Sequence, residues 1–135
     1  MRKSLLILLL VLPLLAVAQE KIKVACIGNS VTYGYGHKDP KATSYPTQLQ
    51  QMLGDKYEVR NFGYSGATLL SKGHRPYINL NEYKAALEFA PDIAVIHLGL
   101  NDTDPRNWPN YRDEFYDDYI NIIKALREAN PEVDV

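Results

Sequence analysis

The chain has 135 residues, with 15 basic and 16 acidic side chains and a formal net charge of −1. This length fits one domain, and a nearly neutral chain without a basic stripe argues against nucleic acid as a partner. A single cysteine, Cys26, excludes an internal disulfide and a cysteine-type metal site. Cys26 lies in an apolar run, so we predict a buried side chain.

The first eighteen residues have the pattern of a secretory signal peptide. Residues 2–3 are basic, residues 5–15 form an apolar run broken by one proline, and residues 16–18 are small. This pattern predicts cleavage before Gln19 and a secreted or periplasmic protein. The apolar run is shorter than the roughly 20 residues of a membrane span, so no stable span is expected after cleavage. A retained N-terminal anchor is the alternative.

Apolar runs then alternate with helical patterns along residues 19–135. Strands are predicted at residues 22–27, 57–62 and 92–98, and helices at residues 45–53, 81–90 and 111–129. Ser44 or Thr43 is expected to cap the first helix, and Gly54 to end it. The third strand is nearly all apolar, which is typical of a strand covered on both faces.

This alternation predicts the α/β class, with a parallel sheet between two layers of helices. The fold expected is a three-layer, flavodoxin-like, doubly wound sheet. Residues 131–135 have the pattern of a fourth strand that has only begun. We therefore expect residues 19–135 to be the N-terminal part of one longer domain, truncated at its fourth strand.

Polar, glycine-rich segments follow each predicted strand, at residues 28–30, 61–68 and 99–102. Because open parallel sheets bind ligands beyond the carboxyl ends of their strands, the three segments are expected to meet at one edge. In order and spacing they resemble the first three sequence blocks of the SGNH, or GDSL, hydrolases. The resemblance covers nearly all of residues 19–135, and it implies a serine ester hydrolase that needs no metal or organic cofactor.

Three residues match the functional positions of that family. Ser30 matches the nucleophile, Gly66 the glycine of the second block, and Asn101 the asparagine of the third. The resemblance implies that the backbone N–H groups of Ser30 and Gly66, with the Asn101 side-chain amide, stabilise the oxyanion of the reaction. Taken singly, a turn or cap residue is the alternative interpretation for Ser30 and Asn101.

Two departures from the family pattern stand out. Asn29 replaces the usual aspartate of the first block, where it can still hydrogen-bond but carries no charge. The Asp-x-x-His block that holds the general base is absent: neither His37, His74 nor His97 has an aspartate three residues before it. We predict that His97 is a core histidine inside the third strand. The base is expected beyond Val135, and the chain alone should be nearly inactive.

Loop residues after the second and third blocks are candidates for substrate binding. The set comprises His74, Arg75, Asp102 and Trp108, with Arg106 and Tyr111 as further candidates, and ordinary loop packing is the alternative for each. Aromatic and polar groups together suit a sugar. Similar sequences are often grouped with exported sialate O-acetylesterases and other carbohydrate esterases, so the resemblance implies O-acetyl groups of glycans, or a small-molecule ester, as substrate.

Other functions are compatible with parts of the pattern. A lipase or lysophospholipase of the same family would be expected to have longer apolar loops. A non-catalytic glycan-binding remnant would explain the missing histidine if the chain ended naturally at Val135. A flavodoxin-like nucleotide binder is disfavoured, because the glycine spacing over residues 28–36 does not fit a phosphate loop.

Overall fold

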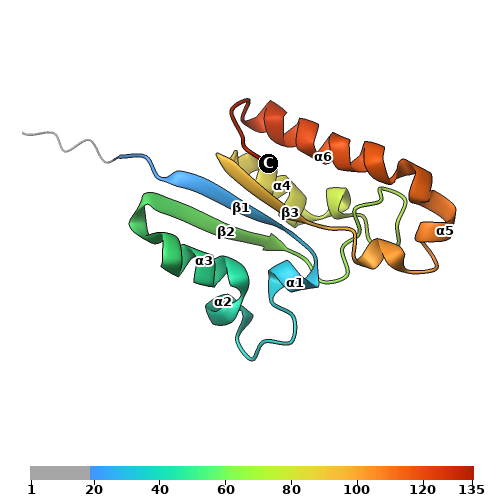
Figure 1. The fold of residues 1–135 in the computed structure, drawn as a ribbon, viewed down its shortest axis with the longest axis horizontal. Coiled ribbons are helices and arrows are strands. Elements are labelled where there is room, and N and C mark those ends of the chain that lie inside the picture. Colours follow the sequence, from blue (N-terminus) through green and yellow to red (C-terminus); the bar gives the residue numbers. More distant parts are fainter. Residues whose placement is uncertain (1–18) are drawn as a thin grey trace, which may run out of the picture.

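The computed structural model describes residues 19–135, so the predicted signal peptide lies outside the described residues. Three parallel strands form the sheet: β1 (Ile22–Gly28), β2 (Tyr57–Gly63) and β3 (Ile93–His97). Their order is β2-β1-β3, which places the first strand at the centre (Figure 1). Beside β3, Asp134 forms an isolated parallel bridge with Ile93, at the place predicted for a fourth strand.

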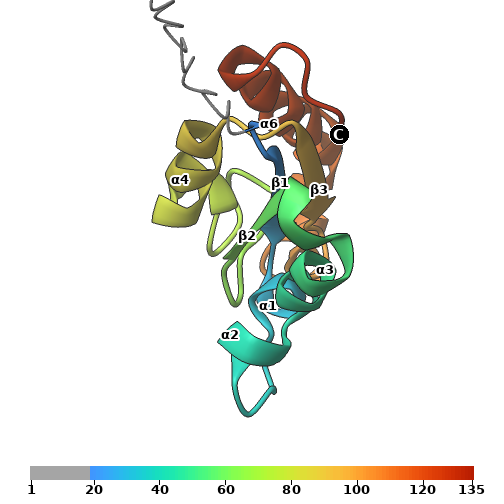
Figure 2. The same ribbon diagram turned by 90° about the vertical axis from the view of Figure 1, so that its left-hand side faces the viewer.

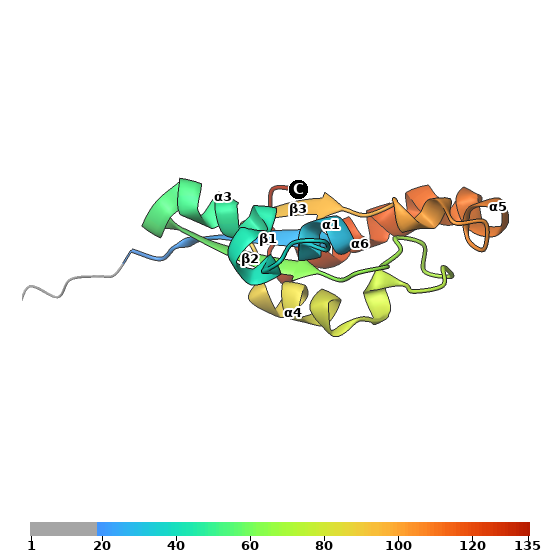
Figure 3. The same cartoon turned by 90° about the horizontal axis from the view of Figure 1, so that it is seen from below.

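Helices connect the strands and cover the sheet. The α-helices are α1 (Ser30–Tyr33), α2 (Pro40–Thr43), α3 (Tyr45–Leu53), α4 (Asn81–Phe89), α5 (Trp108–Tyr111) and α6 (Phe115–Ala129). Short 3₁₀ turns are η1 (Gly54–Lys56), η2 (Tyr77–Asn79), η3 (Asn101–Thr103) and η4 (Arg112–Glu114). Figures 2 and 3 show α3 and α4 on opposite sides of the sheet, which confirms the predicted layers. Within residues 19–135, no helix is long and apolar enough to cross a membrane.

The last helix begins later than the sequence pattern predicts. The periodicity suggested one helix over residues 111–129, whereas α6 starts at Phe115 and is preceded by α5 and η4. Tyr111 has φ −130° and ψ 4°, which is outside the helical region and interrupts the turn. Pro109, at the start of α5, favours a separate short helix because proline is accepted in a first helical turn.

The main core lies between the sheet and the helices α4 and α6. Ile27, Phe62 and Ala94 face it from the three strands, and they pack with Ala86 and Phe89 of α4 and with Ile122 and Leu126 of α6. The Phe62 and Phe89 rings lie 5.6 Å apart between centroids. Burial of apolar surface stabilises this layer by roughly 25 cal/mol per Å², and it fixes β2 and β3 on either side of β1.

On the other face of the sheet, α1, α2 and α3 lie over β1 and β2 but leave β3 open. Val95 keeps 41% of its surface exposed, and His97 is exposed as well. The predictions that β3 is covered on both faces and that His97 is a core histidine are therefore wrong for the described chain. The side chains of Ala94 and Ile96, which alternate with Val95 and His97, face the core.

Candidate active site

Ser30 lies at the first position of α1, directly after the central strand. Asn29 caps this helix, because its Oδ1 accepts a hydrogen bond from the Val31 N–H at 3.0 Å. The turn requires glycine at position 28, because a Cβ there would lie only 2.8 Å from the backbone oxygen of His97. The result is a serine held on a tight strand-to-helix turn, partly exposed at the end of β1.

The second segment lies beside this turn. The Tyr64 N–H donates to the Gly28 carbonyl at 2.9 Å, which ties the end of β2 to the end of β1. Gly66 has φ +83°, in the left-handed region that glycine adopts without steric cost. In the described part of the chain, no hydrogen bond uses the backbone N–H of Ser30 or of Gly66. Both donors remain available for a ligand.

The third segment, residues 99–102, lies at the same carboxyl end of the sheet. The Asn29 N–H donates to the His97 carbonyl at 3.3 Å, and Asn101 Nδ2 donates to the Ala67 carbonyl at 2.8 Å. An amide nitrogen carries two hydrogens, so one N–H of Asn101 remains for another acceptor. Hydrogen bonds thus connect the segments that carry Ser30, Gly66 and Asn101, although these lie up to 71 residues apart in the sequence.

Asp102 has a different place from the one predicted for a substrate contact. It is completely buried, and its carboxylate accepts hydrogen bonds from the backbone N–H groups of Leu69 (2.9 Å) and Leu70 (2.7 Å). Because both oxygens are occupied and none of the side chain is exposed, we assign Asp102 to holding the second segment against the third.

The Asp102 anchor leads to a stability prediction. Asp102→Asn should destabilise the protein by about 3 kcal/mol, because an amide nitrogen would face a backbone N–H and leave that buried donor unsatisfied. Urea denaturation measures this loss. Asp113→Asn is the matched control, since the Asp113 side chain is 97% exposed and its ion pair with Arg112, at 3.7 Å, lies at the surface. A loss below about 1 kcal/mol for Asp102→Asn would contradict the anchoring role.

His74 is connected to the third segment through Asn107. The His74 backbone N–H donates to Asn107 Oδ1 at 2.9 Å, and Asn107 Nδ2 lies 2.9 Å from His74 Nδ1 and 2.9 Å from the Asn101 carbonyl. Since the amide nitrogen only donates, Nδ1 of His74 is the acceptor in this contact. Asn107 is 1% exposed, and its role could not be predicted from the sequence because an asparagine in a proline-rich loop gives no distinguishing signal.

Two other predicted substrate contacts lie near the same edge. Arg75 Nη1 donates to the Ser65 carbonyl at 3.0 Å, and it would lie 2.8 Å from a Cβ at Gly66. Trp108 is 41% exposed and packs edge-on against Phe115, whose ring in turn abuts Gly99. Arg75 therefore borders the second segment directly, whereas Trp108 reaches the third segment through Phe115.

Arg106, a further candidate, is engaged with its neighbour. Its guanidinium donates to both carboxylate oxygens of Asp104, at 2.9 Å and 2.8 Å, and this contact lowers the pKa of the Asp104 carboxyl well below its usual range. The pair is exposed and local. His37, likewise, has its Nδ1 bonded to Thr43 Oγ1 at 2.8 Å. Among residues 19–135, no histidine forms a hydrogen bond to Ser30.

Cys26 is buried in β1, as predicted. Burial raises the pKa of its thiol to about 11, while a hydrogen bond with Tyr45 opposes part of the rise. The folded thiol therefore stays neutral below that pH. Between pH 9 and about 11 the Cys26 thiol ionises in the unfolded chain but not in the folded one, so rising pH lowers the free energy of unfolding. We expect iodoacetamide at pH 8.5 to leave the native thiol unmodified and to alkylate it in urea, as mass spectrometry would measure. Rapid labelling of the native protein would contradict this burial.

The parallel α/β sheet, with a serine on the first turn after its central strand and an asparagine after the neighbouring strand, has the SGNH-hydrolase fold. The chain belongs to the GDSL-like lipase/acylhydrolase family, whose sequence model matches residues 26–135.

Individual relatives agree with this assignment. An acetylxylan esterase from Xylanibacter ruminicola is 51% identical over 109 residues, which cover 81% of this chain and 22% of that protein. The crystal structure of AlinE4, an SGNH-hydrolase family esterase, matches with a TM-score of 0.64 and 25% identity, over 84% of this chain and 57% of AlinE4. A mutant of the same esterase gives a TM-score of 0.63 at 26% identity, over 82% of this chain and 56% of that chain. The chain thus spans about a fifth of the acetylxylan esterase and somewhat more than half of AlinE4.

Proposed function

We propose that this chain supplies the nucleophile and the oxyanion-binding groups of an exported enzyme that hydrolyses acetyl esters on a glycan. The proposal depends on one observation: hydrogen bonds join the three segments that follow the carboxyl ends of the strands. Ser30 stands on its tight turn, with unused N–H groups on Ser30 and Gly66 and with the Asn101 amide on the connected third segment.

In this proposal the hydroxyl of Ser30 attacks the acetyl carbonyl carbon as its proton passes to a general base. The oxyanion that forms accepts hydrogen bonds from the Ser30 and Gly66 N–H groups and from Asn101 Nδ2. Collapse breaks the bond to the sugar oxygen, which takes the proton from the base and leaves as a hydroxyl, while the acetyl group stays on Ser30. Water then cleaves this ester and releases acetate. The base is proposed to be the histidine of an Asp-x-x-His segment beyond Val135.

A xylan-type glycan is the substrate we favour. The acetylxylan esterase from X. ruminicola is 51% identical over the segment that carries Ser30, Gly66 and Asn101, which supports acetyl as the acyl group. Sialate O-acetyl esters are the second candidate, from the sequence resemblance. A lipase or lysophospholipase activity has less support, because polar side chains such as His74 and Arg75 border the carboxyl end of the sheet.

Release of the free carboxylic acid by the full-length protein, acetate from the acetyl esters and fatty acid from the long-chain esters, tests the choice among these substrates. We expect acetylated xylan to be hydrolysed with the highest kcat/KM, O-acetylated sialic acid more slowly, and long-chain acyl esters slowest. The discriminating measurement is the ratio of the first two values. A faster reaction with O-acetylated sialic acid would move the assignment to sialate esters, and a preference for long acyl chains would overturn the glycan proposal.

A further inference from the structure

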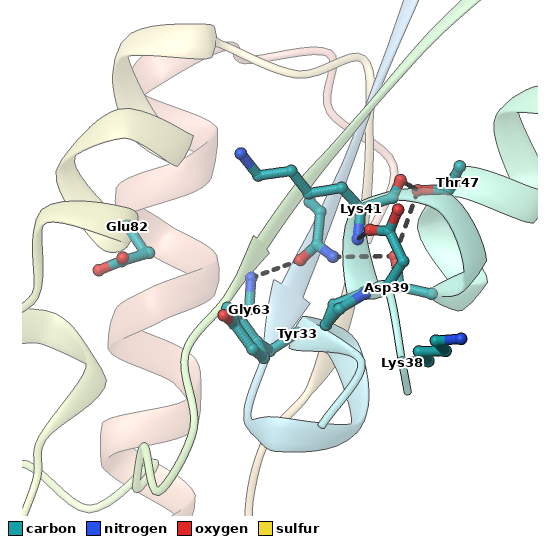
Figure 4. A pocket seen from close by; sticks show the side chains of 10 residues that line it. Tyr33, Lys38, Asp39, Lys41, Thr47, Gly63 and Glu82 are labelled. Atoms are coloured by element: carbon teal, nitrogen blue, oxygen red, sulfur yellow. Dashed lines mark hydrogen bonds between the residues drawn. The ribbon is translucent and has the colours of Figure 1, made fainter. Parts of the chain in front are cut away.

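A hollow opens at the outer edge of the sheet, beside β2. Its volume is about 530 Å³, within the range of small-molecule binding sites. Side chains from both helical layers line it: Tyr33 of α1, Lys38 and Lys41 from the α2 region, Asn61 of β2, and Glu82 of α4. Figure 4 shows Glu82 on the opposite side of the hollow from Lys38, Asp39 and Thr47.

This hollow lies one helical turn from the candidate nucleophile, although Ser30 itself does not line it. Tyr33 ends the helix that Ser30 begins, and three residues of helix rise by only about 5 Å. The bridge between Asp134 and Ile93 extends the sheet at its other edge, next to β3. Within residues 19–135 no further strand pairs with the outer edge of β2, the side on which the hollow opens.

One wall of the hollow is held rigidly by Asn61. Its Nδ2 donates to the Thr32 carbonyl at 2.8 Å and to Ser44 Oγ at 3.3 Å, and its Oδ1 accepts from the Gly63 N–H at 2.9 Å. These bonds tie β2 to α1 and to the start of α3. A wall fixed in this way loses little conformational freedom when a ligand binds.

The groups that line the hollow suit a neutral sugar. Tyr33 keeps 47% of its surface exposed and offers an aromatic face, while the Lys38 and Lys41 ammonium groups donate hydrogen bonds and the Glu82 carboxylate accepts them. Within residues 19–135, none of these three charged side chains forms a salt bridge. Sugar hydroxyls both donate and accept, and the mixed signs of charge favour no ionic ligand.

We propose that this hollow binds a neutral sugar unit of the glycan chain, next to the unit whose acetyl ester is presented to Ser30. The inference rests on the proposed glycan-esterase function and deepens it by assigning a separate binding subsite. Tyr33 would stack on the sugar ring, and Lys41 and Glu82 would bind its hydroxyls.

Calorimetric titration of the full-length protein with deacetylated xylo-oligosaccharides tests this subsite without relying on turnover. We expect Tyr33→Ala to weaken binding by up to about tenfold, the loss that one aromatic contact predicts, and Lys41→Gln to weaken it by a smaller factor. Tyr35→Ala is the matched control, because Tyr35 is 76% exposed and does not line the hollow. Its affinity should equal that of the wild type.

Two results of the titration would contradict the proposed subsite or its ligand. No binding by a folded wild-type protein, or equal affinities in all variants, overturns the subsite. Tighter binding of a glucuronate-bearing oligosaccharide than of the neutral one overturns the choice of a neutral ligand. Acetate release tests the glycan-esterase proposal separately. If the protein binds the oligosaccharide normally but releases no acetate from acetylated xylan, the esterase proposal is wrong and the subsite proposal is still supported.

Discussion

Replacing Ser30 by alanine is expected to lower kcat for acetyl-ester hydrolysis by about 10⁶ in the full-length protein, the loss that follows when a serine nucleophile is removed. Alanine keeps the backbone N–H that we assign to the oxyanion, so the variant retains the binding edge and loses only the attacking oxygen. Steady-state release of acetate measures the change, and a mass increase corresponding to one acetyl group identifies the wild-type intermediate.

Ser30→Ala should leave the fold intact. No hydrogen bond of the Ser30 hydroxyl is present in the described chain, and the Asn29 cap of α1 does not depend on it. An unchanged urea midpoint therefore separates a chemical loss from unfolding. A folded variant that keeps more than a few per cent of wild-type turnover would contradict the nucleophile assignment, and a wild-type protein that binds glycan without hydrolysing any ester would favour the non-catalytic binding alternative.

Much of this site could be predicted because its parts follow from local sequence. The apolar runs of β1 and β3 and the alternating pattern of β2 each end before a glycine or a polar residue, so the three polar segments follow from the predicted strand ends. The choice of Ser30, Gly66 and Asn101 within those segments came from the family resemblance. The parallel topology then brings them to one edge. The bounds of α3, Tyr45–Leu53, agree with the prediction, and Ser44 and Gly54 flank the helix as expected, although the Ser44 side chain forms no capping hydrogen bond.

The features that could not be predicted depend on contacts between segments distant in the chain. Asp102 looked like a substrate ligand, because the sequence does not show that the Leu69 and Leu70 N–H groups need an acceptor. The exposure of His97 has a similar origin. An apolar strand suggests two covered faces, yet the helices of one layer lie over β1 and β2 only. Asn107 was missed because its role exists only once the His74 loop folds back.

Asn101→Ala is the second substitution with a large expected effect, a loss of about 10² to 10³ in kcat, as for removal of one oxyanion donor. The structure adds a complication, since Asn101 Nδ2 also donates to the Ala67 carbonyl at 2.8 Å and so helps to hold the Gly66 loop. The alanine variant loses both interactions. If the donor to the oxyanion dominates, kcat falls and KM changes little, because that hydrogen bond strengthens only in the transition state.

Thr103→Ala provides the matched control for Asn101. Thr103 lies in the same η3 turn, and its Oγ1 donates to the Leu100 carbonyl at 2.8 Å on the exposed side. Its removal perturbs the turn without removing a donor at the edge, so kcat should stay close to the wild-type value. Equal losses in both variants would assign the effect to the turn. A raised KM with unchanged kcat in Asn101→Ala would mean that this amide binds the substrate and its transition state equally, which contradicts a role in the oxyanion hole.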